Sequence, residues 1–377
     1  MKLRYYEYNK LNGRLRLEKN SYLFYIGVFF CPFFHYNSTK REKGKEMEVL
    51  EKPFIDIDDQ LQKLISRGLG ISDLEEARNH LMRVTYYDLI NGYKNMFLHP
   101  KSHENDEDAF ISGTKFEDII SLYKLDRELR NATLEITLDI ECIFYASIAY
   151  SLSKTYGEKE SSYLNETNFK RGVKQGYNGK YERDNLLSVL LDKVKRPKIQ
   201  PLIHYKKKYN NIPPWLLVKG MTFGELVMLY KLSTQEVKNQ VMENILGEKA
   251  DETAKELFSV SIKIFNKFRN WAAHGGRIYN HNCRIELPYN NLHYSLFGIT
   301  KENYINGTGK SDFASLVIAA MFFLKKDYND MLEFIVKLRV NLQNYQKENP
   351  LHFENVIQEM GLPSNYYQSI QDVITKS

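Results

Sequence analysis

The chain is poor in the residues that β-rich, disulfide-bonded and metal-bound proteins need. Among its 377 residues there are only 10 Pro and 20 Gly, which disfavours an all-β protein with many tight turns. Its three cysteines include no close pair, so a disulfide scaffold and a cysteine-based zinc site are excluded. Hydrophobic residues (43%) and aromatic residues (13%) indicate a folded chain. The length predicts two domains, or one large domain with an appended lobe.

Signatures of common enzyme classes are also absent from the sequence. There is no G-x-S-x-G elbow, no P-loop, no G-x-G-x-x-G and no H-E-x-x-H. His99 and His103 are four residues apart, but Pro100 and the acidic run that follows place them in a loop. We therefore expect no metal site and no cofactor.

The net charge of +6 lies entirely in the first 46 residues. They carry ten basic and four acidic residues, whereas residues 47–377 carry 43 of each. The apolar run Tyr22–Phe34 is shorter than the roughly 20 residues of a membrane span and lacks a signal-peptide cleavage site. Three interpretations stay open: a weak signal or anchor, a partner-binding arm, or translation from a start upstream of the native one. We favour the last, with Met47 near the native start and residues 1–46 non-native or disordered.

The rest of the chain has the pattern of an all-α protein with little or no β structure. A long amphipathic helix is predicted from Phe116 to about Tyr156, where Gly157 ends it. Another runs from about Leu257 through Trp271, and a third covers about 312–346. S/T-x-x-E patterns predict capping boxes at four helix starts: Ser72–Glu75, Thr114–Glu117, Thr222–Glu225 and Ser233–Glu236. Only two segments could form short strands: Tyr5–Tyr8 and Arg284–Leu287.

These patterns predict a helical lobe over 47–113, a helical core over 114–346 and a C-terminal tail helix over 347–377. Loops are expected at 101–113, 170–185 and 301–310.

A basic segment at 170–208 stands out from the otherwise neutral chain. It holds twelve basic and three acidic residues, interleaved with tyrosines. Clustered cations with aromatic side chains suit phosphate contacts and base stacking, so the segment predicts an RNA-binding surface. The alternative is an ordinary solvated face of a helical protein. The candidate RNA-binding residues are Lys193, Lys195, Arg196, Lys198, Lys206, Lys207 and Lys208.

The strongest candidate for chemistry is the segment from Phe268 to Arg277. Gly275 and Gly276 predict a helix end, which places His274 at the negative end of the helix dipole and Arg269 about one and a half turns earlier. Two such ends meeting across a dimer axis would form a pocket of two Arg and two His, suited to metal-independent cleavage of RNA. The structural alternative is that Arg269 pairs with an acid and His274 caps the helix.

Several ordered blocks resemble the Abi-like (abortive infection) family of bacterial phage-defence proteins, which belongs to the HEPN superfamily. The block at 86–93 (Y-Y-D-L-I-N-G-Y) and the block at 122–130 (L-Y-K-L-D-R-E-L-R) are similar to family elements. So are I-P-P-W at 212–215 with T-F-G at 222–224, the signature R-N-W-A-A-H-G-G-R-I-Y-N at 269–280, and M-G-L-P at 360–363. Trp271 and Gly275 depart from the usual signature, and Tyr366 stands where a Trp is expected.

The resemblance implies a HEPN-like helical bundle, a homodimer and an endoribonuclease that needs no metal. Arg269 and His274 match the catalytic pair, Asn270 matches its polar neighbour, and Arg277 matches the signature's tail and is a further candidate for binding RNA. The resemblance also implies a toxin-like, cytoplasmic protein without membrane contact, whose partners are substrate RNA and a small regulatory or antitoxin RNA. The alternatives are a non-catalytic RNA-binding module and a protein–protein adaptor.

Arg127 and Arg130 lie three residues apart on the long predicted helix. Asp126 and Glu128 are within reach, so we expect structural ion pairs for both arginines.

Overall fold

A computed structural model describes residues 53–364, 366 and 368. The chain divides into two units, residues 1–54 and residues 55–377, and the fold described below is that of the second. The extension over 1–46 and the strand expected at Tyr5–Tyr8 lie outside the described residues.

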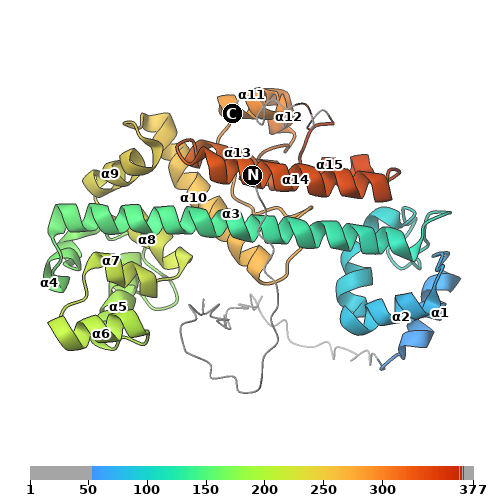
Figure 1. The fold of residues 1–377 in the computed structure, drawn as a ribbon, viewed down its shortest axis with the longest axis horizontal. Coiled ribbons are helices and arrows are strands. Elements are labelled where there is room, and N and C mark those ends of the chain that lie inside the picture. Colours follow the sequence, from blue (N-terminus) through green and yellow to red (C-terminus); the bar gives the residue numbers. More distant parts are fainter. Residues whose placement is uncertain (1–52, 365, 367, 369–377) are drawn as a thin grey trace, which may run out of the picture. The chain divides into compact units, whose positions relative to one another are not determined.

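The described part of the chain is all-α, as the sequence predicts, and contains no strand. Its central element is α3 (Phe116–Tyr156), a helix of 41 residues that ends at Gly157. Helix α14 (Tyr328–Glu348) packs along α3, and α10 (Glu252–Ala273) crosses it (Figure 1). Helix α13 (Phe313–Phe323) packs against α10. Residues 101–113 and 170–181 are irregular, as expected.

Smaller helices surround this centre. On the N-terminal side they are α1 (Ile57–Ser66), α2 (Leu74–Arg83), η1 (Tyr87–Asn91) and η2 (Lys94–Phe97). After α3 come α4 (Glu160–Tyr163), η3 (Glu166–Asn168), α5 (Glu182–Lys195), α6 (Gln200–Tyr209), α7 (Pro214–Leu217), η4 (Val218–Gly220), α8 (Phe223–Leu232) and α9 (Gln235–Leu246). The last three are α11 (Asn291–Phe297), α12 (Lys301–Ile305) and α15 (Phe353–Glu359).

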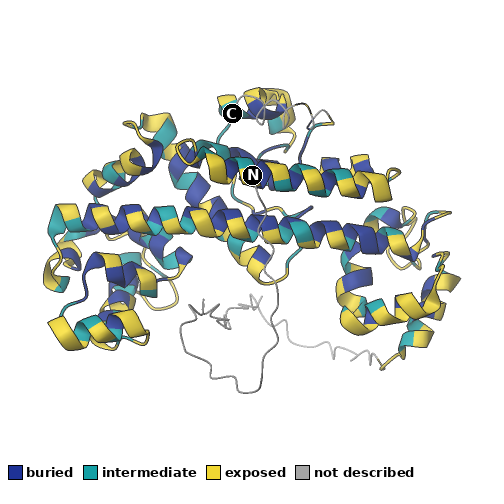
Figure 2. Ribbon diagram, viewed as in Figure 1, coloured by how far each residue is buried: buried dark blue, intermediate teal, exposed yellow. Residues whose placement is uncertain are grey.

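The hydrophobic core lies between α3, α10 and α13. Phe258 of α10 stacks on Phe323 of α13 with ring centroids 5.1 Å apart, and Phe265 meets the same ring edge to face at 5.4 Å. Helix α13 is buried on nearly all sides, whereas α3 and α14 each keep an exposed stripe (Figure 2). Removing this apolar area from water at about 25 cal/mol per Å² is the main force that holds the helices together.

The capping box at Thr222 is confirmed, but the other three helix starts are shifted by one residue. Asp73 replaces Ser72 as the N-cap, because its carboxylate accepts from two amides, those of Glu75 and Glu76. The carbonyl of Thr114 accepts a hydrogen bond from the amide of Gly70, so Thr114 stays in extended backbone and Lys115 becomes the N-cap of α3. Ser233 donates to the Leu229 carbonyl and so closes the preceding helix, which leaves Thr234 to begin the next one.

The single helix expected at 312–346 was wrong, since the structure divides it into α13 and α14. The reason is a difference in environment. Helix α13 is apolar all round and lies in the core, whereas α14 is amphipathic and packs on α3. One straight helix cannot both lie inside the core, as α13 does, and pack along the surface of α3, as α14 does. The connection between them carries Lys325, which forms an ion pair with Glu248.

Two further local predictions were also wrong. Arg284–Leu287 forms no strand, because Arg284 has a left-handed φ of 57° that interrupts an extended run. Residues 301–310 are not entirely a loop, because Thr300 caps the short helix α12. The last four residues of the loop expected at 170–185 likewise belong to α5.

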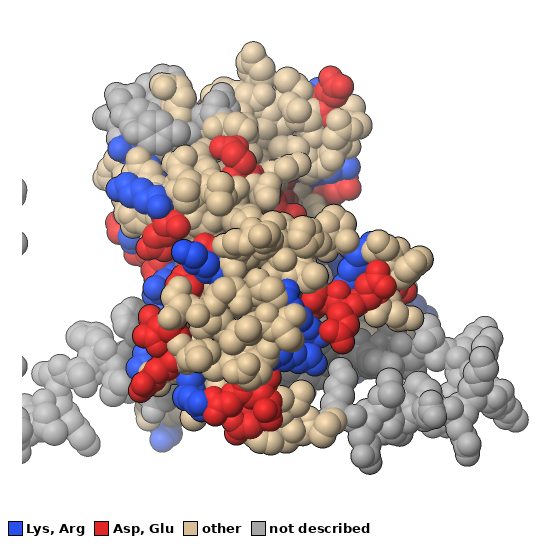
Figure 3. Space-filling view, turned by 90° about the vertical axis from the view of Figure 1, so that its right-hand side faces the viewer, with Lys and Arg blue, Asp and Glu red and all other residues tan. Residues whose placement is uncertain are grey.

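Charges are mixed over the end of the fold that carries α1 and α2. Figure 3 shows cationic and anionic side chains interspersed over this face. Within the described residues, no helix is long and apolar enough to cross a membrane.

Candidate functional site

The signature segment forms the end of α10, as the two glycines predict. His274 is the C-cap, and the amides of Gly275 and Gly276 bond to the carbonyls of Ala272 and Trp271 at 3.1 and 2.9 Å. This is a Schellman motif, which needs a left-handed residue after the cap, and Gly275 supplies it with a φ of 75°. The helix therefore stops sharply, and His274 lies at an exposed corner.

Arg269 is held against the middle of α3. Its Nε lies 3.4 Å from Oε2 of Glu141, and its side chain keeps about a third of its surface exposed. Burial raises the pKa of Glu141, and the guanidinium of Arg269 opposes that rise. Glu141, which sequence reasoning missed, thus fixes the direction of the arginine while the guanidinium keeps part of its surface toward solvent.

Asn270 and His274 are exposed neighbours of Arg269. Asn270 accepts a hydrogen bond from Nη1 of Arg269 at 3.3 Å and donates to Asn266 at 3.2 Å. In the part of the chain that the structure describes, the imidazole of His274 makes no hydrogen bond or ion pair. The polar partners of Arg269 are Glu141 and Asn270 and do not include His274, consistent with the five steps of 100° that separate the two residues around the helix.

Trp271 covers the helix end. Its indole N–H donates to the carbonyl of Arg277 at 2.8 Å, and His281 stacks on it with ring centroids 4.7 Å apart and an interplanar angle of 13°. The indole also lies against Gly276, where an added Cβ would be 2.3 Å from the ring. Any larger residue at 276 would displace the indole.

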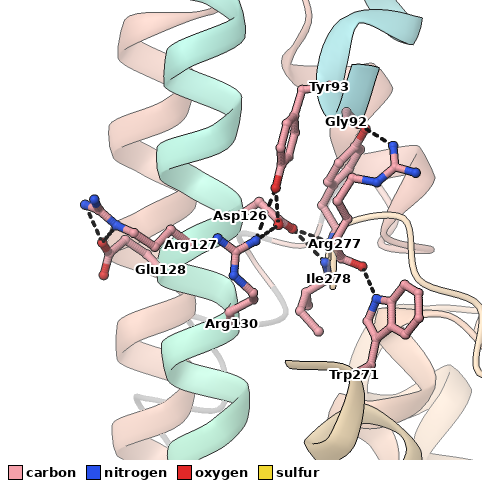
Figure 4. Close-up of polar contacts among 10 residues, drawn as sticks. Gly92, Tyr93, Asp126, Arg127, Glu128, Arg130, Trp271, Arg277 and Ile278 are labelled. Carbon is pink, nitrogen blue, oxygen red and sulfur yellow. Dashed lines mark hydrogen bonds and ion pairs between the residues drawn. The ribbon is translucent and has the colours of Figure 1, made fainter. Parts of the chain in front are cut away.

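Asp126 joins three of the sequence blocks (Figure 4). This buried carboxylate of α3 accepts from the amides of Ile278 and Tyr279 at 2.7 and 2.9 Å. It also accepts from the hydroxyl of Tyr93 at 2.8 Å and forms an ion pair with Arg130. The segment after the helix end is therefore tied to α3 and to the 86–93 block.

The two ambiguous arginines of α3 have different surroundings. Arg130 is nearly buried and pairs with Asp126, whereas Arg127 is exposed and pairs with Glu128 at 3.0 Å (Figure 4). The structural ion pairs expected for both are confirmed. Arg277 donates to the carbonyl of Gly92, so it ties the loop to the N-terminal lobe (Figure 4). That contact is structural, and the expected contact of Arg277 with RNA stays a prediction.

The model of the Abi-like protein family matches residues 79–280. This range covers more than half of the chain and ends at the last residue of the signature. The chain belongs to the Abi-like family. The resemblance to the Abi-like family is thereby confirmed, and it supports a role in abortive infection, the defence of bacteria against phage. Neither the curated proteins nor the solved structures include a significant match.

The structure separates the seven candidate RNA-binding residues in the basic segment of this Abi-like chain into two groups. Lys193 bonds to the Gly220 carbonyl at 2.8 Å and pairs with Glu225, Lys206 pairs with Glu160, and Arg196 pairs with Asp192. The other four are exposed, and no ion pair to them occurs among the described residues: Lys195, Lys198, Lys207 and Lys208. Among these seven candidates, only the second group has cationic charge that no described acidic side chain neutralises.

Lys219 is a cation near the site that sequence reasoning missed. It is exposed on η4, which packs on α3, and its charge acts on Cys142, the residue after Glu141. Nothing in the local sequence pattern points to it, because it approaches Cys142 only through the packing of η4 on α3. Gly224 of α8 lies beside Asn266 of α10. The block at 222–224 thus lies beside the last two turns of α10, whereas the helix that carries Trp215 packs on α3.

Among the described residues there is no group of three or more His, Cys, Asp or Glu side chains that could hold a metal ion.

His281 predicts a pH dependence of stability. Burial, reinforced by the charge of Lys267, lowers its pKa to about 4 from the model-peptide value of 6.5. The unfolded chain then binds a proton between pH 6.5 and 4 that the folded chain does not, so stability falls as the pH falls through this window. Because the ring is only partly buried, we expect a loss of about 1–2 kcal/mol.

The measurement is the urea midpoint of wild type and His281→Phe at several pH values. Phe keeps an aromatic ring against Trp271 but cannot titrate, so its curve should lose this acid-dependent part. Burial raises the pKa of Asp312 to about 6, which acts in the opposite direction but equally in both proteins. Parallel pH curves for the two proteins would contradict the assignment, and His103→Phe on the exposed loop serves as the control.

Proposed function

We propose that this Abi-like chain is a metal-independent endoribonuclease of the HEPN superfamily that acts as a homodimer. One observation carries the proposal. Arg269 and His274 lie at a sharply ended helix on which the distant sequence blocks converge through Asp126, Arg277 and Gly224. Such convergence is expected when a fold must hold a surface-exposed catalytic segment in a fixed position.

The chemistry follows from the two side chains. An exposed imidazole can take the proton of a ribose 2′-hydroxyl or protonate the 5′-oxygen that leaves. The 2′-oxygen then bonds to phosphorus as the bond to the 5′-oxygen breaks, which leaves a 2′,3′-cyclic phosphate. Arg269 neutralises the charge that develops on the phosphoryl oxygens.

The structural alternative for the same residues is also visible, since Arg269 does pair with an acid and His274 does cap the helix. These contacts are compatible with catalysis. Glu141 lies closest to Nε of Arg269, so the two terminal nitrogens of the guanidinium can still bind a phosphate. The helix cap uses the backbone of His274, so its imidazole ring stays available. A positioning carboxylate is a common support for a functional arginine.

A partly exposed apolar row on α3, in which Leu138 is exposed and the other two residues are half-buried, supports the dimer. Leu134, Leu138 and Tyr145 follow a heptad spacing, 4 and then 7 residues apart, with Glu141 at the intermediate position. Leu138 is 45% exposed. A second copy packed on this row would bring its own helix end near Arg269, which the composite site of two Arg and two His requires.

Leu138→Asp is therefore expected to dissociate the dimer and abolish RNA cleavage, because it places a charge in the apolar row at little cost to the folded monomer. Light scattering and a cleavage assay at equal protein concentration are the measurements. Met82→Asp on α2, where Met82 is also exposed, is the matched control and should stay dimeric. A monomeric wild type, or full activity of a monomeric Leu138→Asp, would contradict the dimeric site.

The second candidate function is a non-catalytic RNA-binding module, favoured by the four exposed candidate lysines for which no ion pair occurs among the described residues. Both candidates take RNA as partner, and a small regulatory RNA fits either. Purifying the protein without nuclease and sequencing the RNA that remains bound distinguishes them. Cyclic-phosphate ends on cut RNA support the ribonuclease, whereas intact RNA released by salt supports the module.

A further inference from the structure

The exposed face of α10 carries a row of polar side chains that leads to His274. Lys263, Lys267, Asn270 and His274 follow at i, i+4, i+7 and i+11, and all four are exposed. Residues at this spacing share one face of a helix. In the described part of the chain neither lysine forms an ion pair, so the row presents two free cations and an imidazole within about 16 Å along the axis.

Trp271 borders this row, three residues before His274 and four after Lys267. It is 44% exposed, although it is held from several sides. The Arg277 carbonyl fixes its N–H, His281 stacks on one of its faces, and Gly276 leaves no room for it to shift in that direction. An aromatic ring that is both exposed and fixed loses little entropy when another ring stacks on it.

We propose that Trp271 is a stacking platform for an unpaired nucleobase next to the cleaved phosphate, and that Lys267 binds a neighbouring phosphate. This inference rests on the proposed function and deepens it, because it names single-stranded RNA as the substrate class. Bases in a duplex are stacked on each other and cannot lie on a protein side chain, whereas single strands are commonly bound by aromatic rings and cations together.

The chain offers a direct reporter of this contact. Its only tryptophans are Trp215 and Trp271, so Trp215→Phe leaves Trp271 as the sole indole. The probe is a short single-stranded 2′-O-methyl RNA of mixed sequence, which cannot be cleaved because its 2′-oxygen is blocked. We expect it to quench the Trp271 fluorescence, and we expect a duplex of the same sequence to bind more weakly and quench less.

Affinity measurements with the same probe test the energetic part. Trp271→Ala should weaken binding about tenfold to a hundredfold, the size expected for one stacked base. Trp271→Phe, which keeps an aromatic ring, should recover most of the loss. Trp215→Ala is the matched control, because Trp215 is 45% exposed but lies on α7.

Lys267→Gln tests the phosphate contact. It should lower the log–log slope of binding affinity against salt concentration by about 0.7. Lys255→Gln should leave this slope unchanged, because Lys255 is already paired with Glu252 on the same helix.

The outcomes separate this inference from the ribonuclease proposal. Binding without quenching, or equal affinity of Trp271→Ala and wild type, overturns the platform and leaves the ribonuclease standing. Quenching by a protein that never cleaves natural RNA overturns the ribonuclease and leaves the platform standing. Tighter binding of the duplex overturns the single-strand assignment, and failure to bind either probe overturns both. Thermal melts of each variant show whether it is folded.

Discussion

Replacing His274 with Ala is expected to lower RNA cleavage by about a hundredfold to ten-thousandfold, the usual contribution of a general acid or base. The imidazole is exposed and makes no hydrogen bond or ion pair within the described fold, so the change should leave stability almost untouched. Cleavage of a fluorescent RNA at equal concentrations of dimer is the measurement. Toxicity on expression in bacteria should disappear in parallel.

Arg269 needs a substitution that respects its partner. Arg269→Ala would leave the half-buried carboxylate of Glu141 without its cation. A loss of activity could then result from unfolding and not from the missing guanidinium. Arg269→Lys keeps the charge beside Glu141 but loses the planar fork that binds phosphate oxygens. We expect a folded protein with cleavage lowered about a hundredfold or more.

Two matched controls accompany these variants. His103→Ala lies on the exposed loop, and Arg127→Lys lies on the exposed side of α3. Both should cleave RNA as wild type does. If His274→Ala and Arg269→Lys cleave as well as these controls do, the helix end is not the catalytic site.

The largest loss of stability is expected for Arg130→Ala. Asp126 is fully buried, and Arg130 is 12% exposed, so removing the guanidinium leaves a carboxylate in the core without its counter-charge. Breaking a buried pair in this way costs about 3–5 kcal/mol. Because Asp126 also accepts from Ile278 and Tyr279, the loop after the helix end should loosen together with the core.

Arg127→Ala is the internal comparison, three residues away on the same helix. Its pair with Glu128 is exposed on both sides and should contribute less than about 1 kcal/mol. Urea denaturation of both variants measures the difference. Equal destabilisation would contradict the structural role given to Asp126.

Much of the fold could be predicted from local patterns. The start of α8, the end of α3 at Gly157 and the end of α10 at Gly275 depend on capping and left-handed glycine, which act over a few residues. The division of 312–346 into two helices could not be predicted in this way, because it depends on tertiary packing: α13 packs against α10 and α14 packs on α3. The same is true of Arg284, whose positive φ has no signal in a short β-like run.

The candidate site shows the same limit. Spacing and family resemblance identify Arg269 and His274, and the helix end itself follows from the glycines. Glu141 could not be found, since it lies more than a hundred residues away and reaches Arg269 only through the packing of α10 on α3. Asp126 was visible as a partner of Arg130, but its two amide contacts at 278 and 279 are a property of the folded chain.

The family match ends at residue 280, but the packing does not end there. Helix α13 places Phe323 against Phe258 and Phe265, and α14 covers one side of α3. A fragment trimmed to residues 79–280 would expose these surfaces and should be recovered as an aggregate. The matched segment is therefore not expected to fold by itself, because the helices that cover its core come after residue 280.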